Sequence, residues 1–380
     1  MIKLFLYTTL IFNLFGIFLW CYVGRAGFEI FYPFLISTIL FILIVELKTA
    51  NTINSLPHSK DLFVNIPEKN LPILNAYLLA VIGIGYLFFL EGIPLLSENP
   101  DEQRFIQRKS PLIASSWRVL YFVFPVVAVI FLNKLELKNE PKISLFITLI
   151  IFIGLVLSGS KAAPLFTLIF IFLYYYYFKK FDLLFALPLI AFLISLGIFF
   201  AIILTSFNMN ESFYIATIAL FGRMTLGAGE GYLLAHEYVN SYGMGLGFFT
   251  ILKPLYTLLG TFRLIPKSDY TEDSGVFIAY EYRGLENNAS FTFTFPGLGY
   301  LEFGYLGMLF YTVVFAYFIG VFINSFYKDT NPISKLIKLF LIFNMWYLLD
   351  WGFIDGFIVF LLLYITIFWM GFSTAKNIYR

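Results

Sequence analysis

The chain has 380 residues, of which 60% are hydrophobic, 21% aromatic and 13% charged, and its formal net charge is +2. A mean hydropathy of +0.85 excludes a soluble domain, because too little polar material remains to cover so large an apolar core. The small net charge argues against nucleic-acid binding, and the single cysteine, Cys21, excludes an intramolecular disulfide and a cysteine zinc cluster.

Repeated apolar runs of about 20 residues predict membrane-spanning helices, and so an all-α polytopic membrane protein. We expect ten spans, or twelve if the region before the eighth span also crosses twice. The first run has only Lys3 before it and no small-residue cleavage site after it, so we interpret it as a retained span and not as a removed signal peptide. The expected spans are about 3–22, 28–45, 72–90, 113–132, 143–158, 162–178, 183–206, 297–323, 336–349 and 353–373.

This pattern divides the chain into three regions. Residues 1–206 hold the first seven spans, 207–296 form a long outer loop, and 297–380 hold the last three spans. The loop is too long for a plain connector. Two of its stretches, FYIATIALFG and MGLGFFTILKPLYTLLG, are apolar enough to dip into the membrane or to lie along its surface.

The distribution of cations predicts the orientation. Lysines occupy every alternate loop from the N-terminus onward, which predicts cytoplasmic N- and C-termini. Seven of the eight arginines fall on the opposite, outer side: Arg25, Arg104, Arg108, Arg118, Arg223, Arg263 and Arg283. Because guanidinium binds phosphates and carboxylates in a bidentate manner, we expect an anion site on the outer face. The alternative is a chance distribution in a lysine-rich composition.

The stretch FGRMTLGAGEG, residues 221–231, combines charge with small residues. If 221–238 is helical, Arg223, Glu230 and Glu237 recur every seven residues and share one face. Ionisable residues at membrane depth usually line a cavity. A structural arginine–glutamate pair between two helices explains the pattern equally well. His236 lies off this face and is a reserve candidate for the catalytic base.

Two shorter segments are further candidates for the anion site. In the loop 91–111, Arg104 and its neighbours cluster at helical spacing, although a solvated mixed-charge loop is the usual explanation. In SGSKAAP, residues 158–164, Lys161 lies beside hydroxyls and a helix start, which suits a phosphate. A lysine that reaches to the interface from a span explains the same pattern.

The last candidate is FPGLGYLEFGYLGML, residues 295–309, where Glu302 is the only charge on a glycine-rich helix face. An interfacial anchor is its simplest interpretation. Motifs of metalloproteases, serine hydrolases, P-loop proteins and dinucleotide-binding enzymes are absent from the sequence. DYTED, at 269–273, is the one weak acidic cluster. We therefore expect no metal and no cofactor.

Taken together, these segments resemble the bacterial oligosaccharide repeat-unit polymerases, the Wzy-type O-antigen and capsule polymerases. The similar pieces occur in the same order along the chain: GIPLLSENPDEQR, LSGSKAAP, FGRMTLGAGEGYLLAHEY, GMGLG and GLGYLEFGYLG. Lys161 departs from the family pattern, because many members carry arginine there.

The resemblance implies a GT-C-like membrane architecture and a metal-independent, inverting glycosyltransferase at the outer face of the bacterial cytoplasmic membrane. Its partners would be undecaprenyl-diphosphate-linked oligosaccharides as donor and acceptor, membrane lipid, and a chain-length regulator. On this hypothesis Glu230 is the catalytic base, with His236 and Glu302 as the other candidates. Diphosphate binding falls to cationic residues, namely Arg104, Arg223, Arg263, Arg283 and Lys161.

Two alternatives remain open at this point. An O-antigen ligase-like enzyme would carry similar segments. A lipid-linked oligosaccharide flippase or other transporter belongs to a different class and is expected to show internal repeats and charges at mid-membrane depth in several spans. The sequence shows no convincing repeat, and its candidate charges collect on one side.

Overall fold

The computed structural model describes residues 2–24, 26–53, 88–90, 92–97, 162–178, 212–252, 264–266, 294–329 and 332–351, with isolated positions between them. Over these residues the chain is helical and contains no strand. The elements are α1 (Ile2–Tyr22), α2 (Phe28–Ile53), η1 (Pro94–Leu96), α8 (Ala162–Phe178), α10 (Phe213–Tyr242), the π-helical turn η2 (Phe248–Leu252), α13 (Phe295–Lys328) and α14 (Pro332–Trp351).

Three of these helices, α1, α2 and α13, are long and apolar enough to cross a membrane. The spans predicted at 3–22 and 28–45 are confirmed as continuous apolar helices, whereas the one predicted at 297–323 lies in α13, whose backbone breaks at Phe303 and Gly304. Helix α8 coincides with the predicted span 162–178, and α14 covers the one predicted at 336–349. The five other predicted spans lie wholly or mostly outside the described residues. The described helices are those of an all-α membrane protein.

The exposed faces of the three candidate spans support this conclusion. Each helix carries a stripe of exposed apolar side chains at helical spacing: Leu4, Ile11, Phe15, Phe18 and Tyr22 on α1; Tyr32, Ile36, Ile39, Leu43 and Leu47 on α2; Leu306, Phe310, Val313, Tyr317 and Val321 on α13. Polar side chains lie instead on the buried faces, among them Asn13, Ser37, Thr38, Thr49 and Thr312. A helix in water shows the reverse arrangement, whereas a helix in lipid places its polar groups toward other helices.

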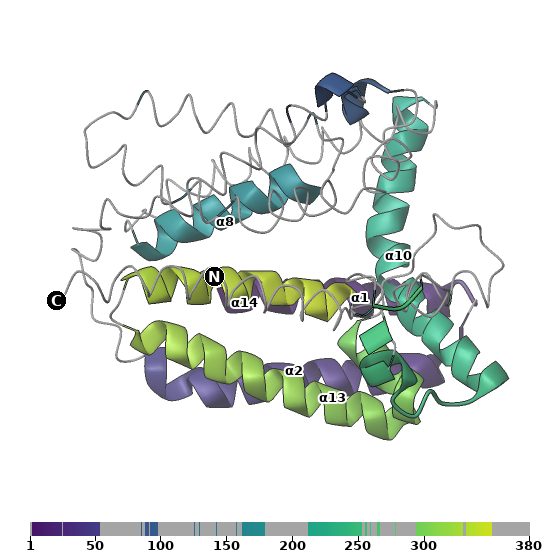
Figure 1. Ribbon diagram of the computed structural model, residues 1–380. Helices are drawn as coiled ribbons and strands as arrows, with labels where there is room; N and C mark the ends of the chain where they lie inside the picture. Colours follow the sequence, from purple (N-terminus) through teal and green to yellow (C-terminus); the bar gives the residue numbers. More distant parts are fainter. Residues whose placement is uncertain are drawn as a thin grey trace. The chain divides into compact units, whose positions relative to one another are not determined.

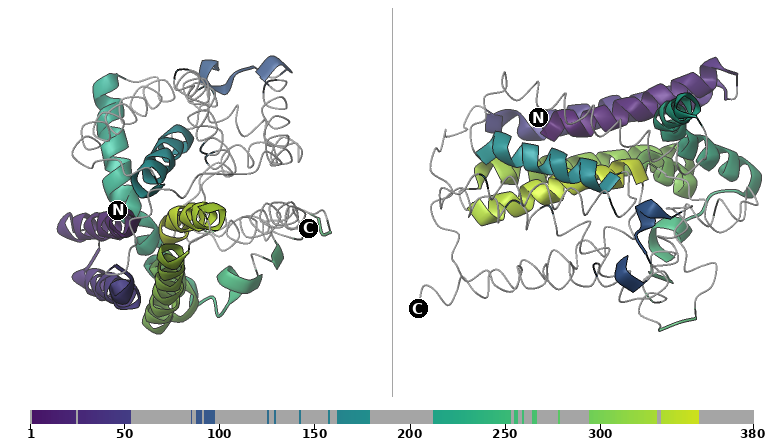
Figure 2. Two further views of the ribbon diagram at one scale, coloured as in Figure 1. Left: turned by 90° about the vertical axis from the view of Figure 1, so that its left-hand side faces the viewer. Right: turned by 90° about the horizontal axis from the view of Figure 1, so that it is seen from above.

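The chain divides into two compact units. Unit 1 comprises residues 1–57, 221–329 and 341–363, and unit 2 comprises 58–220, 330–340 and 364–380. Within unit 2, the rings of Phe170 on α8 and Phe340 on α14 pack edge to face at 5.4 Å. Within unit 1, α2 lies beside both α1 and α13, and the views agree on this bundle (Figures 1 and 2). The candidate site lies in unit 1.

Helix α13 is a hairpin and not a single rod. Its backbone leaves helical geometry at Phe303 and at Gly304, whose φ of 63° favours glycine. A Cβ added at Gly299 would lie 2.6 Å from the carbonyl oxygen of Gly307, and the rings of Phe295 and Phe315 stack at 5.2 Å. Residues 20 positions apart in a straight helix are about 30 Å apart. A short arm, 295–302, therefore folds back along a long arm, 305–328.

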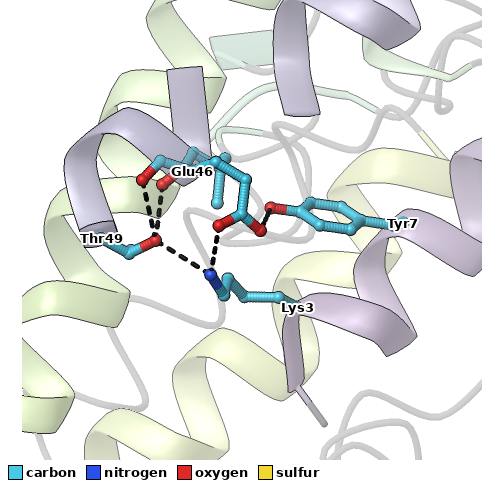
Figure 3. A network of polar contacts seen from close by, with 5 residues as sticks. Lys3, Tyr7, Glu46 and Thr49 are labelled. Atoms are coloured by element: carbon cyan, nitrogen blue, oxygen red, sulfur yellow. Dashed lines mark hydrogen bonds and ion pairs between the residues drawn. The ribbon is translucent and has the colours of Figure 1, made fainter. Parts of the chain in front are cut away.

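At one end of unit 1, a network of polar side chains links α1 to α2 (Figure 3). Lys3 Nζ donates to Glu46 Oε2 at 2.6 Å and to Thr49 Oγ1 at 3.1 Å, while Tyr7 Oη donates to Glu46 Oε1 at 2.8 Å. Both carboxylate oxygens of Glu46 are therefore occupied. Because these residues begin α1 and end α2, the network fixes the two helices antiparallel and defines what we call the clamp end.

The opposite end of unit 1 holds the turn of α13. Helix α2 and the long arm of α13 run in the same direction, since Phe41 contacts Phe295, which stacks on Phe315, and Lys48 Nζ lies 4.3 Å from the ring centre of Tyr317. The start of the long arm therefore lies near the start of α2. We call this the bend end.

Candidate functional site

Helix α10 is continuous from Phe213 to Tyr242, so the condition that 221–238 is helical is met. Helical spacing then places Arg223, Glu230 and Glu237 on one face. Glu230 and Glu237 are partly buried. The side chain of Arg223 lies outside the described residues, although its backbone belongs to the helix.

Helix α10 crosses α1 at a glycine next to Glu230. A Cβ added at Gly229 would lie 2.5 Å from the backbone nitrogen of Ile17 and 2.7 Å from the carbonyl carbon of Gly16. Small residues permit this kind of backbone-to-backbone contact between helices in membranes.

The loop GMGLG, 243–247, follows α10 and docks on the bend of α13. Because the helix breaks at residue 303, the carbonyls of Leu301 and Glu302 lose their partners in the next turn. The loop supplies new donors: Gly245 N bonds to Leu301 O at 2.8 Å, and Leu246 N bonds to Glu302 O at 3.1 Å. The loop thus caps the short arm in place of a side chain, and two segments more than 50 residues apart become one structure.

Glu302 completes this junction. Its side chain is fully buried, and Oε2 accepts a hydrogen bond of 2.5 Å from the backbone nitrogen of Gly247. The left-handed backbone of Gly247, with φ of 95°, turns that N–H toward the carboxylate. The acid expected as an interfacial anchor or as a catalytic candidate therefore lies where it holds the loop to the bend.

His236 lies at the same end of α10 and is partly buried. Its ring stacks on Tyr300 at 5.3 Å, and its Nδ1 lies 3.2 Å from Asn240 Nδ2. With the amide as donor, Nδ1 accepts and the neutral ring carries its proton on Nε2. Burial lowers the pKa of His236, whereas the charges of Glu29 and Glu237 act in the opposite direction. The net effect favours the neutral ring.

Aromatic side chains connect α10 to α2 and α13 beneath His236. The Tyr232 ring lies 5.2 Å from that of Phe34 and 5.8 Å from that of Tyr300, and Tyr300 in turn contacts Tyr305 at 5.0 Å. Tyr232 is 1% exposed, and its hydroxyl has no hydrogen-bond partner among the described groups. A buried hydroxyl of this kind is costly, and a water molecule or a ligand group is its usual complement.

The remaining predicted site residues lie outside the described residues. These are Arg104, Lys161, Arg263 and Arg283. Of the predicted site residues, the structure therefore describes Glu230, His236 and Glu302, all in unit 1, with the backbone of Arg223. His236 contacts Tyr300 on the short arm that ends in Glu302. Among the described residues no group of three metal-ligating side chains occurs.

Several contributors to this site carry no signal in the sequence. Tyr300 and Glu29 contact or influence His236 only because α10, α13 and α2 meet there, whereas Asn240 follows His236 by four residues on α10 itself. Gly247 is the donor to Glu302 across 55 positions of the chain. Only the glycine-rich composition of 243–247 and 297–307 pointed to close backbone packing at these places.

Comparison with known proteins gives no further guide to this chain. No family model matches it, and neither a curated protein nor a solved structure shows significant similarity.

Proposed function

We propose that this chain is a membrane glycosyltransferase that polymerises undecaprenyl-diphosphate-linked oligosaccharide repeat units at the outer face of the bacterial cytoplasmic membrane. One observation carries the proposal: three segments that resemble the repeat-unit polymerases, 221–238, 243–247 and 297–307, pack together in unit 1. If the resemblance of these segments to the polymerases were due to chance, we would not expect the segments to contact one another in the structure.

The proposed reaction follows from the groups on α10. The acceptor sugar hydroxyl gives its proton to Glu230 and attacks the anomeric carbon of the donor. The bond between that carbon and the diphosphate oxygen breaks, and undecaprenyl diphosphate leaves with the electron pair. Arg223, two helical turns before Glu230, stabilises the charge that develops on the leaving group. Arg104, Arg263, Arg283 and Lys161 are proposed as further diphosphate contacts.

The positions of Glu302 and His236 refine these roles. Because the Glu302 carboxylate is buried and bound to Gly247, we assign it to positioning the loop rather than to proton transfer. His236, neutral and with its proton on Nε2, is suited to donate a hydrogen bond to a sugar hydroxyl. Glu230, partly buried on the face it shares with Arg223, remains our choice for the base.

The distribution of charge disfavours the transporter alternative. In unit 1 the Lys3–Glu46 pair lies at the clamp end, and Glu29, His236 and Glu302 lie toward the bend end. The middle of the candidate spans carries no charged side chain among the described residues. A transporter that moves a diphosphate through the membrane needs polar groups at that depth.

The test is polymerisation by the purified protein in vesicles that contain lipid-linked repeat units. We expect a ladder of lipid-linked polymer from the unmodified protein. Glu230→Gln retains size and hydrogen bonding but cannot take a proton, so product should fall about 10²-fold or more. Arg223→Lys keeps the charge but loses the planar fork, and should also lose much of the activity.

Glu46→Gln is the matched control, because it removes an acid of unit 1 from the clamp end. It should retain most of the activity. Transfer of lipid-linked oligosaccharide across the membrane without joining would overturn the proposal in favour of a flippase. Joining to a different acceptor without chain growth would indicate a ligase.

The proposed orientation, with both termini cytoplasmic and ten or twelve spans, has its own test. In a Cys21→Ser background, a cysteine at Ser97, Ser268 or Asn287 should react with an impermeant thiol reagent from outside. A cysteine at Ser59 or Asn331 should not. The reverse pattern would put the site on the cytoplasmic face and contradict the proposed substrate.

A further inference from the structure

The bend end of unit 1 exposes a cluster of large apolar side chains from two segments. On the loop, Met244 is 52% exposed and Leu246 is 74% exposed; on α13, Phe303 is 41% exposed and Leu306 is 80% exposed. The segments are held together by backbone bonds between 245–246 and 301–302 and by the bond from Gly247 to Glu302. We call these four side chains the apolar wedge.

The wedge continues the exposed apolar stripe of a candidate membrane span. Leu306 is the first residue of the exposed stripe on the long arm, which proceeds through Phe310 and Val313 to Val321. The loop joins the stripe directly, since the Met244 side chain lies 3.2 Å from the Cβ position of Gly304. An apolar patch that extends a bilayer-facing stripe has hydrocarbon as its natural neighbour.

The length of the long arm places the wedge at a definite depth. At the clamp end, Asn324 Nδ2 donates to the carbonyl oxygen of Lys48, and this polar contact follows Val321, the last residue of the exposed apolar stripe on the long arm. From Asn324 to the bend at Gly304 is 20 residues, or about 30 Å of helix. The hydrocarbon core of a bilayer is also about 30 Å thick. The wedge therefore lies at the far edge of the hydrocarbon.

The backbone conformation of Leu246 indicates that its exposed side chain has a role. Leu246 has a φ of 50°, the left-handed region that side chains rarely adopt, while glycines surround it in the same loop. Glycine at 246 would remove this strain. The chain instead presents a leucine there with most of its surface uncovered, which is costly in water and favourable in lipid.

We infer that the loop 243–247 and the bend of α13 form a membrane-inserted wedge, which packs against the lipid acyl chains of the leaflet opposite the Lys48 end. The loop lies within the edge of the bilayer and does not extend into water. Glu302 holds it there through the bond to Gly247. This surface is independent of the proposed enzymatic activity, because it rests on exposure, depth and continuity with the span.

Nitroxide labels in reconstituted vesicles test the inference without any assay of activity. In the full-length Cys21→Ala protein, Leu246→Cys and Met244→Cys are labelled separately. Their collision rates are measured with oxygen, which concentrates in hydrocarbon, and with a water-soluble nickel chelate. Phe310→Cys on the lipid stripe is the membrane reference, and Ser241→Cys, an exposed polar position at the end of α10, is the matched neighbour.

We expect the labels at 244 and 246 to resemble the label at 310, with oxygen collisions exceeding nickel collisions, and the label at 241 to be more accessible to nickel. Nickel collisions equal to or greater than oxygen collisions at both loop positions would overturn the inference. Labels at two positions keep the test valid if one variant fails to accumulate.

Discussion

The two ends of unit 1 both carry charged side chains but use them in opposite ways. At the clamp end, Lys3, Tyr7 and Thr49 bond to Glu46 or to one another, so the side chains satisfy each other across two helices. At the bend end, the carboxylate of Glu302 is satisfied by a backbone nitrogen that a glycine turn supplies. At the clamp end the acid is therefore hydrogen-bonded by side chains, and at the bend end by a backbone N–H group.

This difference bears on where function can reside. When side chains satisfy each other, as at Glu46, both carboxylate oxygens already accept a hydrogen bond from α1, so the acid serves to hold α1 to α2. At the bend end, a backbone N–H group satisfies Glu302, and no other side chain is needed for that bond. The side chains of Glu230, Glu237 and His236 on α10 keep part of their surface accessible. A charged pair in the sequence is therefore weak evidence of a site by itself. Glycine-rich segments beside the charge are the more informative feature.

The largest expected effect comes from breaking the hairpin of α13. Gly307→Val places a branched side chain against the backbone of Gly299 and the Cβ of Phe303, so the short arm cannot fold back. Overpacking usually costs about 1–3 kcal/mol, and more where the obstacle is backbone. We expect the variant to disappear from the membrane or to lose its thermal transition in detergent. Immunoblotting of membranes and a thermal-shift assay measure this.

Gly85→Ala is the control for that substitution. A Cβ at Gly85 meets nothing within 4 Å, so the variant should accumulate and melt like the unmodified protein. If Gly307→Val does the same, the two arms of α13 are not in backbone contact.

The next effect separates a positioning role of Glu302 from a chemical one. Glu302→Ala leaves the buried N–H of Gly247 without its acceptor, which costs about 1–3 kcal/mol. Glu302→Gln keeps a carbonyl oxygen there and should recover most of that stability together with activity. Thermal shift and polymer yield are measured in parallel. A Gln variant of normal stability and no activity would instead make Glu302 a participant in proton transfer.

Much of the helical framework follows from the sequence because apolar runs and their length alone determine it. The spans at 3–22 and 28–45 illustrate this. The hairpin does not follow, since the apolar run from 297 to 323, with Glu302 as its one charge, gives no indication that Gly304 reverses the chain. The role of Glu302 is hidden for the same reason: its partner is a backbone atom, and backbone atoms leave no pattern in the sequence.

A smaller effect is expected at the clamp end. Lys3 is 14% exposed and Glu46 is 44% exposed, and a pair open to solvent contributes about 0–1 kcal/mol. Glu46→Gln should therefore lower the unfolding midpoint only slightly. The swap Lys3→Glu with Glu46→Lys should restore part of that loss, because a clamp needs opposite charges but not a fixed order.

The same swap at the proposed site gives the contrast. Arg223→Glu with Glu230→Arg should leave the protein at normal levels but inactive, because a substrate requires each charge in its own place. Recovery of activity by this swap would make the α10 charges a second clamp. It would move the proposed diphosphate site to Arg104 and Arg263.

The smallest effect concerns the protonation of His236. Burial lowers its pKa against the opposing charges of Glu29 and Glu237, so the folded state binds the proton less tightly than the unfolded chain, whose histidine pKa is about 6.5. The stability that depends on the neutral ring is therefore fully present above that pH and is lost as the pH falls through the folded-state pKa.

In a His58→Gln background His236 is the only histidine, and its imidazole resonances in detergent report the pKa directly. We expect a value below the ordinary one, a further decrease in Glu29→Gln because an attractive charge is removed, and an increase in Asn240→Asp because a carboxylate beside Nδ1 favours the protonated ring. A pKa at or above the ordinary value would contradict this prediction. It would mean that the ring of His236 is exposed to water and does not pack against Tyr300.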